Sequence, residues 1–526
     1  MRLDTVLLEH CRRTPHKPAV VCGDRRVTFG ELAESIRRIA GGLHDLGLRV
    51  GDRLVLYVPN SIEFVEAMFG ALAAGAIVIP VTTRLTLNEL AYFCRDSGAK
   101  AVVCHADSAA GVANILADTG AAGIVIGGTH AGMRAFGEVR SAPMRSLPQI
   151  PVEHDTSLVM YTSGTTGRPK GVELTHANIL IQHGYMNGVE WRINADDRYL
   201  VVAPMAHRAG LGRLMNAMML GGTLFVLKQF DAERIVETIE RERITVFGMV
   251  PTMCRMLLPE LEKAPGRCRS LTRIAVTGEA FPVELKQRLI ELLPDTELVS
   301  FFGMTEAGGV TNLSHAEQFT HPESVGRPAP GVEARIVDAN GRDVPTGEVG
   351  ELAVRSGKPG AFTVMKQYFN RPQETADAIR DGWFFTGDLA TMDGDGYISI
   401  VDRKKDMIVS GGLNIYSKEV ELVIATMPGI AAVAVVGVPD PVFGEAVAAF
   451  IETAGSAAAP APAPEAIIAH CREAIASYKK PKHVFYRPVL PRNAVGKVLK
   501  HELAAEARAA LAAGAAGPES TRHSAR

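Results

Sequence analysis

Apolar positions along the first three hundred residues alternate between the spacing of helices and that of strands. Residues 28–46 carry apolar side chains every three to four positions, and Thr28 with Glu31 forms a capping box that starts a helix. Further apolar patterns predict strands at 53–58, 101–104, 199–203, 246–250 and 273–277, and helices at 62–74, 232–243 and 283–293. This succession predicts an α/β domain built on stacked, mostly parallel sheets.

The pattern changes after about residue 326. Short alternating segments at Glu333–Val337 and 351–355 are separated by Gly, Pro and Asp turns, which predicts antiparallel strands in a small β-barrel-like subdomain. A charged stretch at 402–406 then precedes a last α/β unit. We therefore predict a large N-terminal domain at 1–401, a small C-terminal domain at 402–512 and a disordered tail at 513–526.

Composition narrows the classes of partner. The net charge of 526 residues is only −2, so neither nucleic acid nor an anionic membrane is indicated. Seven scattered cysteines without a CxxC pair support neither a zinc site nor a disulfide scaffold, and predict reduced thiols in the cytoplasm. The longest apolar run, residues 69–81, is too short to span a bilayer, so any membrane contact would be peripheral.

The stretch YTSGTTGRPKG at 161–171 carries the clearest chemistry. It follows an apolar strand at 158–160, and its glycines allow backbone N–H groups to approach a ligand. Its residues suit a polyphosphate, although Pro169 and Gly171 beside the lysine exclude a Walker A loop. The hydroxyls, glycines and cation concerned are Thr162, Ser163, Gly164, Thr165, Thr166, Gly167 and Lys170. The alternative interpretation of such a composition is a flexible surface loop.

This loop resembles the phosphate loop of the adenylate-forming enzymes, which include acyl-CoA synthetases, luciferases and the adenylation domains of peptide synthetases. Four later segments resemble motifs of that family in the same order: FFGMTEAG at 301–308, FFTGDLA at 384–390, DRKKDMIVSGGLNIYSKEVE at 402–421 and PRNAVGKVLK at 491–500. The resemblance covers roughly residues 7–503. It implies that the C-terminal domain is mobile, with Asp402 as the hinge.

A nucleotide site is implied by the same motifs. Glu306 offers a hard oxygen ligand of the kind that Mg²⁺ prefers, and the resemblance makes Thr305 a phosphate contact. Phe302 stands where the family usually has a tyrosine that stacks on adenine. The resemblance also assigns adenine contact to the segment after the strand at 273–277, and ribose contact to Asp388 and Arg403. Besides the loop residues above, the predicted ATP site comprises Gly278, Glu279, Ala280, Phe302, Gly303, Met304, Thr305, Asp388, Arg403 and Lys497.

Two further segments are implied to act on the substrates. Lys497, which follows Gly496, resembles the lysine that drives adenylation by reaching both the attacking carboxylate and the α-phosphate. Ser410, Gly411 and Gly412 resemble the residues that line the pantetheine tunnel of acyl-CoA synthetases. The predicted catalytic residues are Lys497, Thr305, Glu306 and His207, and the predicted metal ligand is Glu306.

The acyl pocket is predicted around His207 in the segment PMAHRAGLG. By resemblance His207 closes the pocket, either as a wall or as an acid–base group, and the small residues Gly210, Ala307, Gly308 and Gly309 leave room for an acyl group. Arg208 has two interpretations: it pairs a second carboxylate of a diacid substrate, or it is a surface or supporting arginine.

These features predict an AMP-forming acyl-CoA synthetase, a ligase that joins a carboxylic acid to CoA through an acyl-adenylate. ATP and CoA are its expected co-substrates, with Mg²⁺, and the acid is expected to be a medium- or long-chain fatty acid or an aryl acid. The alternatives are adenylation for a carrier protein, a luciferase-like oxygenase, and a nucleotide-binding regulator without catalysis. The sequence leaves the oligomeric state open.

Overall fold

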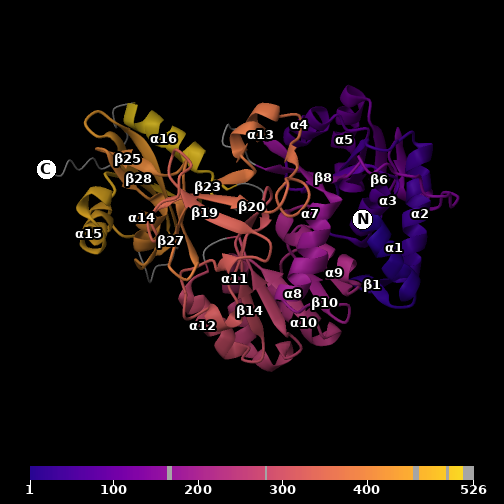
Figure 1. Ribbon diagram of the computed structural model, residues 1–526, viewed down its shortest axis with the longest axis horizontal. Helices are drawn as coiled ribbons and strands as arrows, with labels where there is room; N and C mark the ends of the chain where they lie inside the picture. The colour runs from indigo at the N-terminus through magenta and orange to yellow at the C-terminus, as the bar shows by residue number, and fades with distance from the viewer. Residues whose placement is uncertain (163–168, 279–280, 454–460, 493–496, 513–526) are drawn as a thin grey trace. The chain divides into compact units, whose positions relative to one another are not determined.

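The computed structural model describes residues 1–162, 169–278, 281–453, 461–492 and 497–512 (Figure 1). Contacts divide the chain into two units. The first unit comprises Met1–Arg335, Ala353–Thr386 and Asp393–Ser399, and the second comprises Ile336–Leu352, Gly387–Met392 and Ile400–Arg526. The division into domains at 1–401 and 402–512 stays a prediction, and the predicted tail lies outside the described residues.

An eight-stranded sheet forms one half of the first unit. Its order is β21–β9–β8–β4–β3–β5–β6–β7. Neighbouring strands from β8 to β7 in this order are parallel, whereas β8–β9 and β9–β21 are antiparallel. The strands are β3 (Arg53–Tyr57), β4 (Ile77–Pro80), β5 (Ala101–His105), β6 (Ala122–Ile126), β7 (Met133–Ala135), β8 (Thr156–Thr162), β9 (Lys170–Thr175) and β21 (Gln367–Tyr368). Helices α3 (Ile62–Ala73), α4 (Leu87–Ser97), α5 (Ala106–Thr119) and α6 (Phe136–Arg140) connect them.

A seven-stranded sheet has the order β14–β13–β12–β10–β11–β1–β2 and is parallel except at β1–β2. The strands are β1 (Pro18–Cys22), β2 (Arg25–Thr28), β10 (Arg198–Val201), β11 (Thr223–Val226), β12 (Val246–Met249), β13 (Arg273–Val276) and β14 (Glu297–Ser300). Phe225, Phe247 and Ile274 pack in one core with Leu257 and Leu289 of the covering helices. The prediction of mostly parallel sheets is confirmed.

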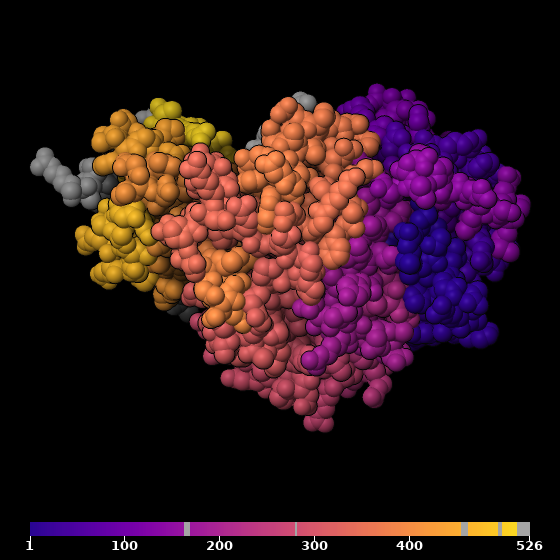
Figure 2. Space-filling view, in the orientation of Figure 1, coloured from indigo at the N-terminus to yellow at the C-terminus, as the bar shows by residue number. Residues whose placement is uncertain are grey.

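The remaining helices of the first unit follow from local signals. Thr28 Oγ1 accepts the Glu31 N–H at 3.2 Å, and the Thr28 N–H donates to the Glu31 carboxylate at 2.8 Å, as the capping box predicts. The elements are α1 (Leu3–Arg13), α2 (Phe29–Asp45), α7 (His176–Leu180), the π-helix η1 (Ile181–Met186), α8 (Asn187–Glu190), α9 (Arg208–Leu220), α10 (Ala232–Glu242), α11 (Pro251–Lys263), η2 (Pro265–Cys268), α12 (Val283–Leu292), η3 (His315–Glu317) and α13 (Pro372–Ala378). In the space-filling view the indigo N-terminal residues adjoin the purple residues of the same unit without a break (Figure 2).

Smaller sheets follow in the sequence, as the change of pattern predicted. β15 (Gly303–Met304) pairs with β16 (Gly308–Gly309), and β17 (Thr311–Asn312) pairs with β18 (Arg327–Pro328). A five-stranded sheet contains β19 (Glu333–Val337), β20 (Gly350–Arg355), β22 (Ile379–Arg380), β23 (Trp383–Met392) and β24 (Ile398–Arg403). The strands predicted at Glu333–Val337 and 351–355 are confirmed.

The second unit carries its own sheet, with β26–β25–β28–β27 in order and β29 parallel to β28. Its elements are β25 (Ile408–Ser410), β26 (Leu413–Ile415), β27 (Ile430–Asp440), β28 (Gly444–Thr453), β29 (His483–Arg487), α14 (Ser417–Ala425), α15 (Pro464–Ala474), η4 (Ser477–Lys479) and α16 (Lys500–Ala512). Val435 packs with Val420 of α14, whereas the next residue, Val436, packs with Leu503 of α16. Neighbouring residues of β27 thus face two separate cores, which makes this a small α/β unit. No helix among the described residues is both long and apolar enough to cross a membrane.

Candidate nucleotide and acyl site

Both ends of the predicted phosphate loop are fixed by a β-hairpin. β8 and β9 are antiparallel, and Thr162 pairs directly with Lys170. The Tyr92 hydroxyl donates to the Pro169 carbonyl at 2.9 Å, which anchors the end of the loop. The predicted contacts at Ser163, Gly164, Thr165, Thr166 and Gly167 lie outside the described residues.

A second hairpin presents Thr305 and Glu306 at its tip. Gly303 and Met304 of β15 pair with Gly309 and Gly308 of β16, so the two predicted residues lie in the connection. A Cβ atom at Gly303 would lie 2.6 Å from the Gly308 carbonyl oxygen, which makes glycine necessary at 303. The motif residues are therefore placed by the close approach of two backbones.

Glu306 is the centre of the candidate site in the first unit. Its Oε1 accepts the Thr162 hydroxyl at 3.3 Å and the Tyr368 hydroxyl at 3.2 Å. The Lys170 ammonium lies 5.3 Å from the centroid of the Tyr368 ring. Three segments far apart in the sequence thus bring a carboxylate, two hydroxyls and a cation together.

Tyr368 is a site residue that the sequence did not reveal. It lies on β21 opposite Val172 of β9, and no motif in the surrounding residues distinguishes it from any other aromatic residue. Burial, followed by the nearby charge of Glu306, raises the pKa of Tyr368, so its phenol stays a hydrogen-bond donor. The tyrosine therefore fixes the orientation of the Glu306 carboxylate.

Tyr368→Phe is expected to lower kcat/KM for ATP by about tenfold or more, because a hydrogen bond to a charged group is worth roughly 1.5–3 kcal/mol. The measurement is steady-state pyrophosphate release over a range of ATP concentrations. Tyr199→Phe is the matched control, since it loses a phenol bond to the Asn194 carbonyl at 3.0 Å elsewhere in the same unit. Equal effects of the two substitutions would contradict a role for Tyr368 at the site.

The predicted adenine contacts meet at one edge of the seven-stranded sheet. Gly278 follows β13 and Phe302 follows β14, and these neighbouring strands are parallel, so both residues lie at their carboxyl ends. The Thr277 hydroxyl donates to the Phe301 carbonyl at 3.0 Å and ties the two strand ends together. Glu279 and Ala280 lie outside the described residues.

In the second unit, Asp388 and Arg403 form an ion pair. The Arg403 Nε lies 2.7 Å from the Asp388 Oδ1, and Asp388 is buried. The structure thus brings together the two residues predicted to contact ribose, and their binding of ribose stays a prediction. Lys497 is exposed, and its neighbour Val498 forms an antiparallel bridge with Arg492.

The predicted hinge residue is firmly held within the second unit. Asp402 is buried and accepts the Ser417 hydroxyl at 2.9 Å and the Arg403 N–H at 2.7 Å. Lys500 donates to the same Ser417 hydroxyl at 2.7 Å. The contact division passes between Ser399 and Ile400, close to this residue in the sequence. A hinge at Asp402 stays a prediction.

The glycines at 411 and 412 have a structural reason of their own. They form the two-residue turn between β25 and β26, where Ser410 pairs with Leu413. Both have positive φ, +59° and +81°, as a tight hairpin of this kind requires. The turn alone therefore explains the pair of glycines, and contact with CoA stays a prediction for Ser410, Gly411 and Gly412.

Around the predicted acyl pocket, the glycines lie in close contact with neighbouring protein atoms. His207 is the N-cap of α9, and its Nδ1 accepts the Ala209 N–H at 3.5 Å. A Cβ atom at Gly210 would lie 2.2 Å from the Pro204 carbonyl oxygen. The space beside Gly308 is filled by Gln182 and Thr363, and that beside Gly309 by Gln182. These contacts explain the glycines without a ligand, and the pocket roles of His207, Gly210, Ala307, Gly308 and Gly309 stay predictions.

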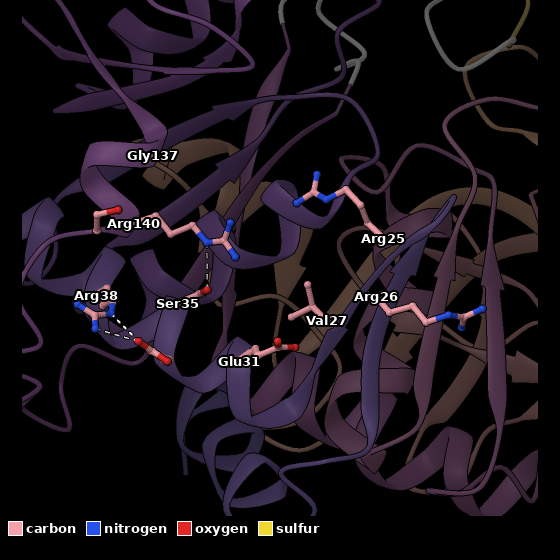
Figure 3. Close-up of a pocket in the computed structure, with 10 residues that line it drawn as sticks. Arg25, Arg26, Val27, Glu31, Ser35, Arg38, Gly137 and Arg140 are labelled. Atoms are coloured by element: carbon pink, nitrogen blue, oxygen red, sulfur yellow. Dashed lines mark hydrogen bonds and ion pairs between the residues drawn. The ribbon is translucent and has the colours of Figure 1, made fainter.

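A surface pocket of roughly 740 Å³ lies apart from these residues and is rich in arginine (Figure 3). Each of its four arginines has a carboxylate partner, and the pairs are Arg25–Glu63, Arg26–Glu242, Arg38–Glu34 and Arg140–Glu66. Arg140 also donates to the Ser35 hydroxyl at 3.2 Å. Since these charges are already paired, the pocket offers little to an anionic ligand.

Models of known protein families match most of this chain. Residues 7–369 match the family model described as AMP-binding enzyme, and residues 419–497 match that of the AMP-binding enzyme C-terminal domain. The chain is 37% identical over 499 residues to a feruloyl-CoA synthase from Amycolatopsis sp, covering 94% of this chain and 97% of the relative. It is 35% identical over 489 residues to the long-chain-fatty-acid–CoA ligase FadD13 of Mycobacterium tuberculosis, covering 91% and 92%.

A solved structure is similar over nearly the whole chain. The o-succinylbenzoate CoA synthetase from Bacillus subtilis, in complex with its acyl-adenylate intermediate, superimposes with a TM-score of 0.84 at 28% identity. The match covers 95% of this chain and 97% of that structure.

Proposed function

Because the chain belongs to the AMP-binding enzyme family and is a carboxylic acid–CoA ligase, we propose that it activates a fatty or aryl acid through an acyl-adenylate. The observation that carries this proposal is the convergence of Thr162, Lys170 and Tyr368 around Glu306. A feruloyl-CoA synthase and a long-chain fatty-acid ligase among the relatives support the two classes of acid.

In the first half-reaction the acid carboxylate attacks the α-phosphorus of ATP, forming the acyl-adenylate and releasing pyrophosphate. The cation of Lys170 and the hydroxyl of Thr162 suit the phosphates, which they position and stabilise. Lys497 serves this step by neutralising charge on the carboxylate and the α-phosphate. In the second half-reaction the CoA thiol attacks the acyl carbonyl, and AMP leaves.

Glu306 fits a magnesium ion in the way that such ions are commonly held, by one carboxylate and the phosphates of the nucleotide. Bound there, Mg²⁺ would neutralise developing phosphate charge. Tyr368 and Thr162 both donate hydrogen bonds to Oε1, which orients the carboxylate without removing its charge.

All seven cysteines are free thiols, which supports placing the enzyme in the reducing cytoplasm.

The test is a panel of fatty and aryl acids assayed for AMP and pyrophosphate release, with and without CoA. Acyl-CoA formation that depends on one of these acids is expected. If only a carrier protein discharges the acyl-adenylate, the enzyme adenylates for a carrier protein. If a product forms only with oxygen, the enzyme is a luciferase-like oxygenase. An absence of pyrophosphate release with every acid would contradict the proposal.

Gly412→Leu and Gly412→Ala are expected to destabilise the second unit equally, by about 1–2 kcal/mol, because each places a Cβ atom at φ +81°. Only leucine adds bulk beyond Cβ, so only Gly412→Leu should block transfer to CoA and leave acyl-AMP bound. Urea unfolding measures the first effect, and trapping of acyl-AMP with and without CoA measures the second. If CoA discharges the adenylate equally fast in both variants, the thiol does not pass Gly412.

A further inference from the structure

Two arginines of α9, one buried and one half-buried, have no carboxylate partner among the described residues. Arg213 is 4% exposed, and Arg208 keeps some exposed surface although its Nη1 atom is enclosed. Among the described residues, neither forms an ion pair, and neither Arg208 Nη1 nor Arg213 Nε has a hydrogen-bond partner. Burial lowers the pKa of each guanidinium to about 10, which still leaves both charged at neutral pH.

These arginines differ from those of the surface pocket, each of which forms an ion pair with a carboxylate. Enclosing a charged group without a partner costs free energy, because the group loses its hydration. For Arg213 a cation–π contact offsets part of this cost, since its guanidinium lies 5.5 Å from the centroid of the Trp191 ring. No comparable contact holds Arg208 among the residues that the structure describes.

The position of Arg208 within α9 adds to the excess of positive charge. It is the first residue of this 13-residue helix, where the helix dipole is positive and a cation is disfavoured. The free N–H groups of a helix start and a guanidinium both favour an anion. Since Arg208 keeps some exposed surface, a ligand can reach it.

A buried polar cluster lies against the same helix. His183 belongs to the π-helix η1, a form that often marks functional sites, and its Nδ1 donates to Asn216 Oδ1 of α9 at 2.8 Å. Asn187 Nδ2 donates to the same oxygen at 3.0 Å. Burial and then the charge of Arg208 hold the pKa of His183 well below its usual range, so its imidazole is neutral. The Nδ2 of Asn216 and the Nε2 of His183 have no partner among the described residues.

Hydrogen bonds connect this cluster to the hairpin that carries Glu306. The Gly309 N–H donates to Gln182 Oε1 at 2.7 Å, and Gln182 Nε2 donates to Asn187 Oδ1 at 2.8 Å. A continuous buried network therefore runs from the candidate nucleotide site to α9. Arg208 and Arg213 lie on the same helix as Asn216, the residue at which this network reaches α9.

We propose that Arg208 binds a second carboxylate at the far end of the substrate acid, with Arg213 and the Asn216–His183 cluster providing a positive, hydrogen-bonding environment. The enzyme then prefers dicarboxylic acids, either α,ω-dicarboxylic fatty acids or aryl acids with a second carboxylate. This inference rests on the proposed function and narrows its substrate class. Neither arginine has an anionic partner in the part of the chain that the structure describes, and the second carboxylate supplies one.

The first test compares matched acids on the full-length enzyme with ATP, Mg²⁺ and CoA. Adipate is paired with hexanoate, suberate with octanoate, and 2-succinylbenzoate with 4-oxo-4-phenylbutanoate, which lacks only the carboxylate on the ring, and AMP formation is measured. Each diacid is expected to have a kcat/KM about tenfold or more above that of its partner, because a site built for a polar group rejects analogues that lack it. Equal or better turnover of the monoacids would overturn the proposal.

The second test assigns the preference to a residue. In Arg208→Met the diacid-to-monoacid ratio of kcat/KM should fall about tenfold or more, and in Arg208→Lys it should fall less, because lysine keeps the charge and loses the fork of donors. Arg234→Met, at an exposed position of α10, is the control and should leave the ratio unchanged. A ratio that persists in Arg208→Met would overturn the assignment.

Thermal unfolding separates recognition from a structural role and does not depend on turnover. Without ligand, Arg208→Met should melt no lower than the wild type, because it removes a charge whose enclosed Nη1 atom has no hydrogen-bond partner among the described residues. Adipate with ATP should raise the Tm of the wild type but not of Arg208→Met. A large loss of Tm in the unliganded variant, with no effect of adipate on the wild type, would make Arg208 structural. If no acid is turned over yet adipate still protects through Arg208, the proposed function fails and the anion site stands.

Discussion

Lys497→Ala is expected to slow acyl-adenylate formation by about 10²–10³-fold while sparing the reaction of a supplied acyl-adenylate with CoA. The reason is electrostatic: an ammonium that neutralises the attacking carboxylate and the α-phosphate has no counterpart in the thiol step. Lys497 is exposed and precedes Val498, which forms an antiparallel bridge with Arg492.

Two assays are needed to measure this effect on Lys497→Ala. Pyrophosphate release in a single turnover reports adenylation, and conversion of synthetic acyl-AMP to acyl-CoA reports the second step. Lys480→Ala is the matched control, because its ammonium bonds only to the Ser477 backbone and hydroxyl at 3.1 and 3.5 Å among the described residues. Equal losses in both half-reactions would show that Lys497 supports the second unit in general and not adenylation.

Glu306→Gln is expected to lower kcat/KM by about 10²-fold or more and to raise the magnesium concentration needed for half-maximal rate. An amide has nearly the same shape and still accepts the hydroxyls of Thr162 and Tyr368, so the hairpin should stay folded. It lacks the charge that a hard cation requires from its ligand. A magnesium titration of pyrophosphate release is the measurement.

Glu317→Gln provides the comparison, since Glu317 also accepts a tyrosine hydroxyl, that of Tyr397 at 2.7 Å, in the same unit. Its magnesium requirement should match that of the wild type. If Glu306→Gln shows the same requirement and rate as Glu317→Gln, the Glu306 carboxylate only holds the hairpin in place.

Several features of this protein are determined by residues close together in the sequence. The α2 capping box joins Thr28 to a residue three positions later, and buried strands such as β3 arise from uninterrupted apolar runs. The phosphate loop is likewise recognisable from adjacent glycines, hydroxyls and a lysine. Such features depend on backbone preferences and on short-range spacing, so they can be predicted without knowledge of how the chain folds back on itself.

The glycines show where local patterns are insufficient. A glycine pair at 411–412 suggests passage of a ligand, yet both residues have the positive φ that their hairpin turn needs. Gly308 and Gly309 suggest an open pocket, yet Gln182 occupies the space beside both. A missing side chain can serve a turn, a packed neighbour or a ligand, and only the surrounding atoms distinguish the three.

The sequence by itself therefore determined the α/β class, the order of the motifs and the identity of the candidate reactive groups, because each is encoded in adjacent residues. Only the tertiary structure placed Tyr368 against Glu306, 62 residues apart, and joined Gly309 to Gln182, 127 residues apart. It also showed that Arg208 has no carboxylate partner among the described residues, whereas the arginines of the surface pocket are paired. Hydrogen-bond partners and burial depend on which distant segments the sheets bring together. That strand order cannot be predicted from the spacing of apolar and polar residues within a short segment.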